Sequence, residues 1–239
     1  MKVTFVIPAY NEEKRIASCI ETIDAFVKTN AGNSFTILLI VEKSTDQTLK
    51  IALNLTQTLS HFHVVDNLVH RGKGYAVKSG MLLAQGDIVF FMDVDLSTSL
   101  DHVLPFIDVF HSQPNLDVII GDRRHQQSIF MQRQGVIRQS MGQTFNHLVC
   151  FLVGSDFKDT QCGFKAFRKK VVRPIFEKSI IDGFSFDVEI LWLAKKLGFS
   201  ILAMPVKWKN DRESKVNIVR DSLKMIYELL VVKARSYTF

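Results

Sequence analysis

Residues 87–95 read DIVFFMDVD, an unbroken apolar run followed by two carboxylates that one residue separates. A run that is apolar on both faces is typical of a strand in a parallel sheet that helices cover on both sides. Open parallel sheets bind their ligands at the carboxyl ends of the strands. The stretch therefore predicts an α/β fold, and it places Asp93 and Asp95 where such a fold binds its ligands.

Strands and helices alternate on either side of this stretch. Short apolar runs predict strands at residues 3–7, 35–41, 62–65 and 118–120. Helical spacing and cap residues predict four helices. One follows Asn11, one runs from the cap at 44–46 to about Leu59, and the other two cover residues 73–83 and 101–111. Residues 133–153 are long enough for one or two helices, and residues 219–233 read as an amphipathic helix whose apolar face comprises Val219, Leu223, Ile226 and Leu230. No repeat or linker divides the chain, so we expect one domain over residues 1–239, with a mostly parallel sheet flanked by helices.

The composition excludes several classes of protein. Of the 239 residues 47% are hydrophobic and 23% are charged, which excludes a disordered chain. The three cysteines, Cys19, Cys150 and Cys162, form no CxxC pair, so we expect neither a disulfide framework nor a zinc ribbon, and a reducing, cytoplasmic compartment fits best. The apolar run at 3–7 is too short for a signal peptide, and the longest run, at 148–153, is far below the ~20 residues that span a bilayer. We therefore expect no transmembrane segment and no signal peptide.

Charge is divided unevenly along the chain. Lys and Arg number 30 against 24 Asp and Glu, but residues 1–120 hold 9 basic and 13 acidic residues, whereas residues 121–239 hold 21 and 11. A basic second half favours an anionic partner, which is nucleic acid, a phosphorylated substrate or an acidic membrane; a solvated basic face explains the charge equally well. Nucleic acid fits least, because the basic residues are not interleaved with an aromatic platform or a recognition motif.

Two acidic residues and one loop are candidates for binding a metal and a phosphate. Asp93 and Asp95 supply the hard oxygen ligands that Mg²⁺ or Mn²⁺ prefers when substrate phosphates complete the coordination, although most such triplets are ordinary caps or turns. Residues 70–74 read HRGKG before a predicted helix, where glycines permit close approach and the helix N-terminus favours an anion. The simpler interpretation of this loop is a turn and a helix start.

The basic second half supplies candidate phosphate ligands. Arginine's planar fork suits phosphate oxygens, and cations lie between apolar stretches at Arg123, Arg124, Arg133, Arg138, Arg212 and Lys215. For any single arginine, an ion pair with a neighbour is the simpler explanation. Asp159 either orients an acceptor or caps a turn.

Four motifs occur together and in order: residues 6–13, 72–74, 92–97 and 159–165, which read VIPAYNEE, GKG, MDVDLS and DTQCGFK. In this combination the chain resembles the inverting GT-A glycosyltransferases of family 2 over nearly its whole length. More narrowly it is similar to the polyprenyl-phosphate glycosyltransferases. Residues 159–165 and 186–189 resemble the dolichyl-phosphate β-glucosyltransferases more than the dolichyl-phosphate mannose synthases.

The resemblance implies a Rossmann-like GT-A fold and a role for each matching residue. Residues 1–120 would form the nucleotide-sugar half, and residues 121–239 the half that faces the acceptor and the membrane. The implied donor-binding residues are Pro8, Ala9, Tyr10, Glu12, Glu42, Lys73 and Asp93. Asp93 and Asp95 would hold Mg²⁺ or Mn²⁺. The acceptor phosphate would be held by Arg124, Arg138, Arg212, Ser214 and Lys215, and the implied catalytic residues are Asp93, Asp95, Asp159 and Arg138.

Two departures from the family pattern concern the nucleotide base. The family usually has Asp-Asp-Gly-Ser after the second strand, whereas residues 41–46 read VEKSTD, which lacks the glycine and is one residue shorter. Glu42 is a substitute acceptor for a base or ribose donor, but Lys43 has no counterpart that we can explain. His70 stands where an asparagine commonly precedes the Gly-Lys-Gly loop. The choice of base therefore stays open.

The expected reaction is an inverting transfer of glucose from UDP-glucose to a polyprenyl phosphate, dolichyl or undecaprenyl. We expect it on the cytoplasmic face of a membrane, where the protein is peripheral or is recruited by a membrane-protein partner. A phosphate monoester is already ionised near neutral pH, so it needs a general base less than a sugar hydroxyl does. The alternatives are mannose transfer from GDP-mannose, transfer to a saccharide hydroxyl with Asp159 as base, and a nucleotide-sugar-binding module without turnover.

Overall fold

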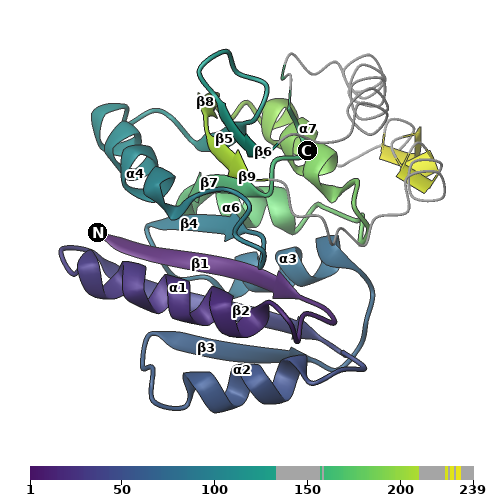
Figure 1. Cartoon of the computed structure of the whole chain (residues 1–239). Coiled ribbons are helices and arrows are strands. Elements are labelled where there is room, and N and C mark those ends of the chain that lie inside the picture. The colour runs from purple at the N-terminus through teal and green to yellow at the C-terminus, as the bar shows by residue number, and fades with distance from the viewer. Residues whose placement is uncertain (133–156, 158, 210–223, 226, 229, 233–239) are drawn as a thin grey trace.

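The computed structural model describes residues 1–132, 157, 159–209, 224–225, 227–228 and 230–232 (Figure 1). The strands of this part are β1 (Lys2–Ala9), β2 (Ser34–Glu42), β3 (Phe62–Asn67), β4 (Ile88–Met92), β5 (Val118–Asp122), β6 (Ile129–Gln132), β7 (Phe164–Arg168), β8 (Ile201–Pro205) and β9 (Lys207–Lys209). The helices are α1 (Ile16–Thr29), α2 (Thr48–Thr56), α3 (Lys73–Leu83), a 3-10 turn η1 (Leu100–His102), α4 (Val103–Ser112), α6 (Lys169–Phe176) and α7 (Phe186–Lys196).

Seven strands form one sheet in the order β3-β2-β1-β4-β7-β5-β8, and β6 and β9 pair separately. Within the large sheet β7 runs antiparallel to both its neighbours, β4 and β5, and the other described pairs are parallel. The predicted mostly parallel α/β sheet is thus confirmed. The strand β7, which comes from the second half of the chain, lies between strands β4 and β5, which precede it in sequence.

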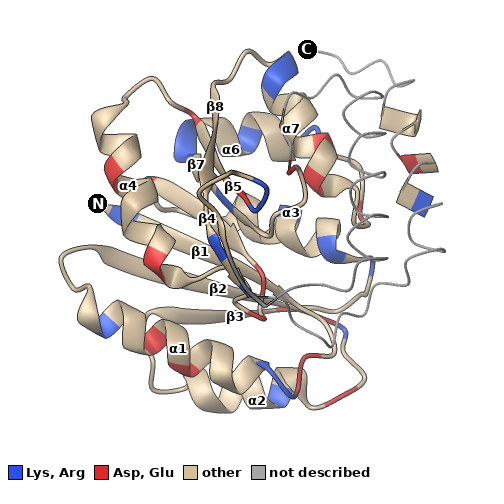
Figure 2. Cartoon of the chain, turned by 45° about the horizontal axis from the view of Figure 1, so that its top comes forward, with Lys and Arg blue, Asp and Glu red and all other residues tan. Residues whose placement is uncertain are grey.

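Helices cover both faces of the sheet, and each face has its own apolar core. Along β4, Ile88, Phe90 and Met92 pack with α1, α2 and α4 on one face. Val89 and Phe91 pack with α3, α6 and α7 on the other face. This alternation explains why the run is apolar without interruption, because each side chain enters one core or the other. Charged residues lie mainly on the helices and loops (Figure 2).

The predicted strands and the helix at 73–83 are confirmed, and three details of the other helices differ from expectation. Asn11 does not cap α1, which begins at Ile16; its Oδ1 instead accepts the Thr45 amide at 2.8 Å. The helix α2 ends at Thr56, short of Leu59. In the C-terminal helical residues Leu230 is 49% exposed, so it does not share the buried face, to which Met225 and Val232 belong.

Several expectations concern residues outside the described part. The segment 133–153 and the apolar positions Val219, Leu223 and Ile226 lie there, as does Cys150. Among the described residues, no helix is long and apolar enough to span a bilayer. The two described cysteines, Cys19 and Cys162, are buried free thiols.

Candidate active site

Asp93 and Asp95 follow β4 at the carboxyl edge of the sheet, and Lys73 reaches them from the first turn of α3. The Lys73 Nζ lies 2.7 Å from Asp93 Oδ1. The Ser97 amide donates to Asp95 Oδ1 at 2.9 Å. Leu96, in the same turn, has a φ of 46°, a strained value for a leucine, and strain of this kind concentrates at functional sites.

Two carboxylates and one ammonium group interact electrostatically in this cluster. Burial and the neighbouring Asp93 carboxylate raise the pKa of Asp95, because two negative groups repel each other. Burial lowers the pKa of Lys73, but the Asp93 and Asp187 carboxylates outweigh it and hold this pKa above its usual value. No group of three or more His, Cys, Asp or Glu side chains in the described ranges is arranged to hold a metal. Asp93 and Asp95 supply hard oxygens of the kind that Mg²⁺ or Mn²⁺ prefers.

Gly163, which directly precedes β7, contacts Asp93. The Asp93 amide donates to the Gly163 carbonyl at 3.1 Å. A Cβ at Gly163 would lie 1.9 Å from Asp93 Oδ2, so the carboxylate occupies space that only a glycine leaves open.

A buried ion pair lies beneath this carboxylate. Lys165, which is 0% exposed, pairs with Asp187 in the first turn of α7, and its Nζ also donates to the Cys162 carbonyl at 2.7 Å. Burial raises the pKa of Asp187, and the Lys165 and Lys73 ammonium groups oppose this shift. Both ammonium groups lie near the Phe91 ring, at 5.3 Å for Lys73 and 5.8 Å for Lys165.

Glu42 organises the loop that precedes α3. Its carboxylate is buried and accepts the Arg71 and Gly72 amides, both at 3.1 Å, and its Oε2 lies 2.6 Å from His70 Nδ1. The His70 ring stacks on Tyr10 with a centroid distance of 3.6 Å. The structure thus gives Glu42 a contact that the sequence did not suggest, which is support of the loop that carries Lys73.

The loops after β1 and β2 are joined by polar contacts. The Asn11 amide donates to Ser44 Oγ at 3.1 Å, and the Glu12 amide donates to Thr48 Oγ1 at 2.6 Å. The Glu12 carboxylate accepts Arg15 Nε at 2.6 Å. Pro8 and Ala9 are buried at the end of β1, beside β2. The implied donor-binding residues therefore gather at adjacent strand ends, β1, β2 and β4, and at the start of α3.

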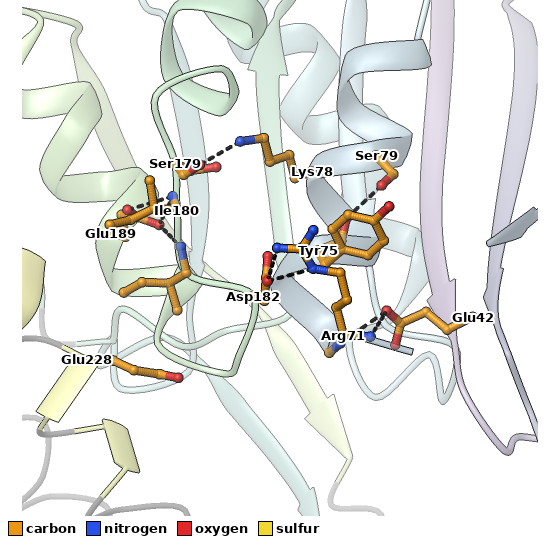
Figure 3. A network of polar contacts seen from close by, with 12 residues as sticks. Glu42, Arg71, Tyr75, Lys78, Ser79, Ser179, Ile180, Asp182, Glu189 and Glu228 are labelled. Atoms are coloured by element: carbon orange, nitrogen blue, oxygen red, sulfur yellow. Dashed lines mark hydrogen bonds and ion pairs between the residues drawn. The ribbon is translucent and has the colours of Figure 1, made fainter. Parts of the chain in front are cut away.

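Residues 179–183, between α6 and α7, form a strap that holds the start of α3 (Figure 3). The Asp182 carbonyl accepts the Gly74 amide at 2.8 Å, and the Asp182 carboxylate pairs with Arg71. Gly72 has a φ of 128°, and a Cβ there would lie 2.6 Å from the Asp182 carbonyl oxygen, so glycine is required. Glu189 anchors the strap from α7 by accepting the amides of Ile180 and Ile181, both at 2.9 Å.

Asp159 forms a bidentate ion pair with Arg123, just beyond β5. Its oxygens accept Arg123 Nε at 2.7 Å, the second guanidinium nitrogen at 2.8 Å and the Arg123 amide at 2.9 Å. Burial would raise the pKa of Asp159, but the Arg123 guanidinium outweighs it and lowers this pKa to about 2. The Arg123 guanidinium also lies 5.4 Å from the Trp208 ring centroid.

The implied phosphate-binding set is described only at Arg124. Its amide donates to Asp122 Oδ1 at 2.8 Å, which places it at the carboxyl end of β5 on the edge that also bears Asp93. The remaining members, Arg138, Arg212, Ser214 and Lys215, lie outside the described residues.

Sequence reasoning missed the supporting residues Gly163, Lys165, Asp182, Asp187 and Glu189. Four of these five lie in or near the two motifs at 159–165 and 186–189, so those motifs were the available signal. Their partners were not predictable, because the pairs join strands to helices and loops that are distant in the sequence.

Comparisons with known proteins agree with these features. The family model described as "Glycosyl transferase family 2" matches residues 4–176. A dolichyl-phosphate beta-glucosyltransferase from Dictyostelium discoideum is 30% identical over 242 residues, which cover 98% of this chain and 74% of that protein. The protein of the same name from Saccharomyces cerevisiae is 31% identical over 250 residues, covering 97% and 74%. That from Homo sapiens is 26% identical over 247 residues, covering 99% and 76%.

Solved structures share the fold. Glucosyl-3-phosphoglycerate synthase from Mycobacterium tuberculosis in complex with UDP superposes with a TM-score of 0.72 at 19% identity, covering 99% of this chain and 82% of that one. The same enzyme with Mn²⁺, UDP-glucose and glycerol 3-phosphate gives 0.69 at 17% identity, covering 97% and 79%. The expected GT-A fold is thus confirmed.

Proposed function

Because the chain belongs to glycosyltransferase family 2, we propose that it transfers glucose from UDP-glucose to a polyprenyl phosphate, dolichyl or undecaprenyl. The observation that carries this proposal is the similarity to dolichyl-phosphate beta-glucosyltransferases over nearly the whole chain. It includes residues 121–239, the proposed acceptor half, as well as residues 1–120, the proposed nucleotide-sugar half. A likeness limited to the donor half would support sugar-nucleotide binding without indicating the acceptor.

The donor is assigned to the carboxyl edge between β2 and β4. Pro8, Ala9, Tyr10 and Glu12 would line the nucleotide pocket, and Glu42 would hold the loop that brings Lys73 to the diphosphate. Asp93 and Asp95 would hold Mg²⁺ or Mn²⁺, which supplies positive charge to the leaving diphosphate when it is bound.

The proposed reaction is a single displacement. A lipid phosphate oxygen forms a bond to the anomeric carbon while the bond from that carbon to the diphosphate oxygen breaks, so that UDP leaves and the configuration inverts. The chain's own contribution is to orient the two phosphates and to balance their charge, which are the main sources of rate in such transfers. Arg124, Arg138, Arg212, Ser214 and Lys215 are the proposed acceptor ligands.

The environment of Asp159 disfavours transfer to a saccharide hydroxyl. Such a transfer needs a base with a pKa near the working pH, whereas Arg123 holds the pKa of Asp159 at about 2. In the proposed reaction Asp159 has a different role, which is to hold Arg123 beside the acceptor site.

We assign the protein to the cytoplasmic face of a membrane as a peripheral protein, since its acceptor is a membrane lipid. An acidic surface adds up to about 1 kcal/mol per nearby Lys or Arg, so the basic second half favours such binding. Cosedimentation with vesicles that contain anionic lipid should decrease as salt rises, since added salt screens these charges. Equal binding to neutral vesicles would contradict the assignment.

The first test is transfer of labelled sugar into the organic phase. UDP-glucose and GDP-mannose are supplied in parallel with dolichyl phosphate and Mg²⁺ or Mn²⁺. We expect product from UDP-glucose and a loss of at least about a hundredfold in Asp95→Asn, whose side chain cannot supply the same negative charge. Asp108→Asn is the matched control, because Asp108 is an exposed carboxylate on α4 and should be dispensable.

Each other outcome favours a named alternative. Product from GDP-mannose alone assigns the mannosyl reaction. Metal-dependent UDP binding without lipid product indicates another acceptor, such as a saccharide, or a binding module without turnover. Equal activity in Asp95→Asn and the native chain contradicts the metal assignment.

A further inference from the structure

The side chain of Lys73 contacts one of the two carboxylates that are proposed to hold the metal. Its Nζ is 2.7 Å from Asp93 Oδ1, and the Asp95 carboxylate adds a further attraction. A divalent cation that approaches Asp93 and Asp95 in the absence of donor therefore meets an ammonium group already on one of its two protein ligands. Like charges at this distance repel strongly, especially in a partly buried site.

Contacts on three neighbouring amides hold the backbone around Lys73. Glu42 fixes the Arg71 and Gly72 amides, and the Asp182 carbonyl fixes the Gly74 amide. Lysine itself is a point charge on a flexible four-carbon stem, and the Lys73 side chain remains 23% exposed. A change of partner at Lys73 is thus a rotation of one side chain, with no movement of the loop.

The charges of the cluster indicate when that change is favourable. Three carboxylates, Asp93, Asp95 and Asp187, face two ammonium groups, Lys73 and Lys165. Lys165 is fully buried against Asp187, whereas the Lys73 side chain is 23% exposed, so of the two Lys73 is the one that a ligand can reach. A nucleoside diphosphate is negatively charged, so it can form an ion pair with the Lys73 ammonium group in place of Asp93. The Asp93 carboxylate is then free of its ion pair.

We propose that Lys73 is a resident counter-cation, whose ammonium group neutralises the Asp93 carboxylate until the donor binds. Lys73 then pairs with the donor diphosphate, and the Asp93 carboxylate becomes available to the metal ion. This inference rests on the proposed function, since it takes the donor to be a nucleoside diphosphate. It assigns Lys73 a role in coupling metal binding to nucleotide binding, in addition to its contact with the donor. Metal and nucleotide then strengthen each other's binding reciprocally, as linkage requires.

The test is a titration of the full chain with Mn²⁺, in which electron paramagnetic resonance measures the free ion, with and without UDP and without acceptor. In the native chain UDP should strengthen Mn²⁺ binding by about tenfold or more. In Lys73→Met, Mn²⁺ alone should bind about tenfold more tightly than in the native chain, while the effect of UDP falls toward unity. A lost structural contact would weaken metal binding, so the sign of the change separates the two explanations.

Two further variants complete the design. Lys28→Met, on α1, removes an exposed lysine that pairs with Asp24 outside the site and should leave both affinities unchanged. Lys73→Arg keeps the charge and should keep the weak binding of Mn²⁺ alone. Thermal unfolding confirms that each variant is folded, and if Lys73→Met does not fold, the native chain and Lys73→Arg still test the coupling.

Specific results would overturn the inference. If Lys73→Met binds Mn²⁺ alone no more tightly than the native chain while UDP still promotes Mn²⁺ binding, Lys73 is no counter-cation. If Mn²⁺ and UDP bind the native chain independently, the coupling is absent, but labelled lipid product still supports the proposed function. If neither ligand binds and no product forms, the proposed function fails as well.

Discussion

A single hydrogen atom at Gly163 leaves room for the Asp93 carboxylate. A Cβ there would lie 1.9 Å from Asp93 Oδ2, so Gly163→Ala must displace the carboxylate or the β7 backbone. We expect Mn²⁺ affinity to fall at least about tenfold and the free energy of unfolding to fall by about 1–3 kcal/mol, the usual cost of overpacking. Gly32→Ala is the control, since a Cβ there meets nothing within 4 Å. Unchanged Mn²⁺ binding in Gly163→Ala would contradict this role.

The Asp159–Arg123 pair predicts a specific dependence of stability on pH. The folded pKa of Asp159, about 2, lies below its ordinary value of 3.8, so the ionised carboxylate stabilises the fold above pH 4. This contribution is lost as the pH falls through the interval from about 4 to 2. Asp159→Asn should lower the free energy of unfolding at pH 7 by about 3 kcal/mol, because Arg123 is left without its charge partner.

Urea unfolding at several pH values measures this difference. The gap between the native chain and Asp159→Asn should be constant above pH 5 and should narrow below pH 4. A gap that widens with acid would show that Asp159 is not ionised in the folded chain.

At the residue scale the sequence indicated where the proposed metal and donor ligands lie, but not the residues that support them. Asp93, Asp95 and Lys73 stand beside strand ends or at a helix start, positions that periodicity and glycines reveal. Lys165 pairs with Asp187 22 residues away, and Arg123 with Asp159 36 residues away. Nothing local marks either pair, because charged residues are ordinarily exposed and only the tertiary fold buries these.

At the scale of elements, the strap at 179–183 joins α7 to the start of α3. Glu189, fully buried, holds the strap by two backbone amides, whereas the Asp182 carboxylate pairs with Arg71 in a half-exposed contact. Glu189→Gln replaces one accepting oxygen by a donor and should destabilise the chain by about 1–3 kcal/mol. Asp182→Asn should cost less than about 1 kcal/mol, as exposed pairs do.

Hydrogen exchange separates a local effect from a global one. In Glu189→Gln the amides of Gly74 and Tyr75, which donate to the Asp182 carbonyl, should exchange faster than those of β1. Equal acceleration at both places would mean that Glu189 supports the whole fold and has no particular role in the strap.

The predicted starts of two helices differ in outcome: the start of α3 is confirmed, and the predicted cap of α1 is wrong. The start of α3 was predictable because Gly72 and Gly74 mark it. Asn11 has the chemistry of a cap, but its side chain binds Thr45 in the loop after β2. Local and distant amides compete for the side-chain oxygen of such a residue, and the tertiary fold decides which of them binds it.

At the scale of the whole molecule, β7 joins the two proposed halves. It comes from the second half, lies between β4 and β5, and carries Lys165 into the interior. The alternation of helical and strand patterns predicted the mostly parallel sheet. These patterns did not predict that β7 inserts between β4 and β5 in the antiparallel direction. A strand at residues 164–168 has the same apolar pattern in either direction, because side chains alternate identically in both.

This arrangement predicts that the chain unfolds as one unit. Trp192 and Trp208 both lie in the second half, so tryptophan fluorescence reports that half, whereas far-UV circular dichroism reports all the strands and helices. A sheet that runs through both halves should make the two urea transitions coincide. Separate transitions would contradict the prediction of one domain.

Lys165→Met tests whether β7 stabilises both halves. It leaves the Asp187 carboxylate buried without its cation, and removal of one partner from such a pair costs about 3–5 kcal/mol. Lys165→Met combined with Asp187→Leu should recover most of that loss, because apolar side chains of similar volume often replace a buried ion pair at little cost. Both transitions should move together in each variant, since β7 belongs to the core of both halves. If only the fluorescence transition moves, β7 stabilises the second half alone, and the sheet is not one cooperative unit.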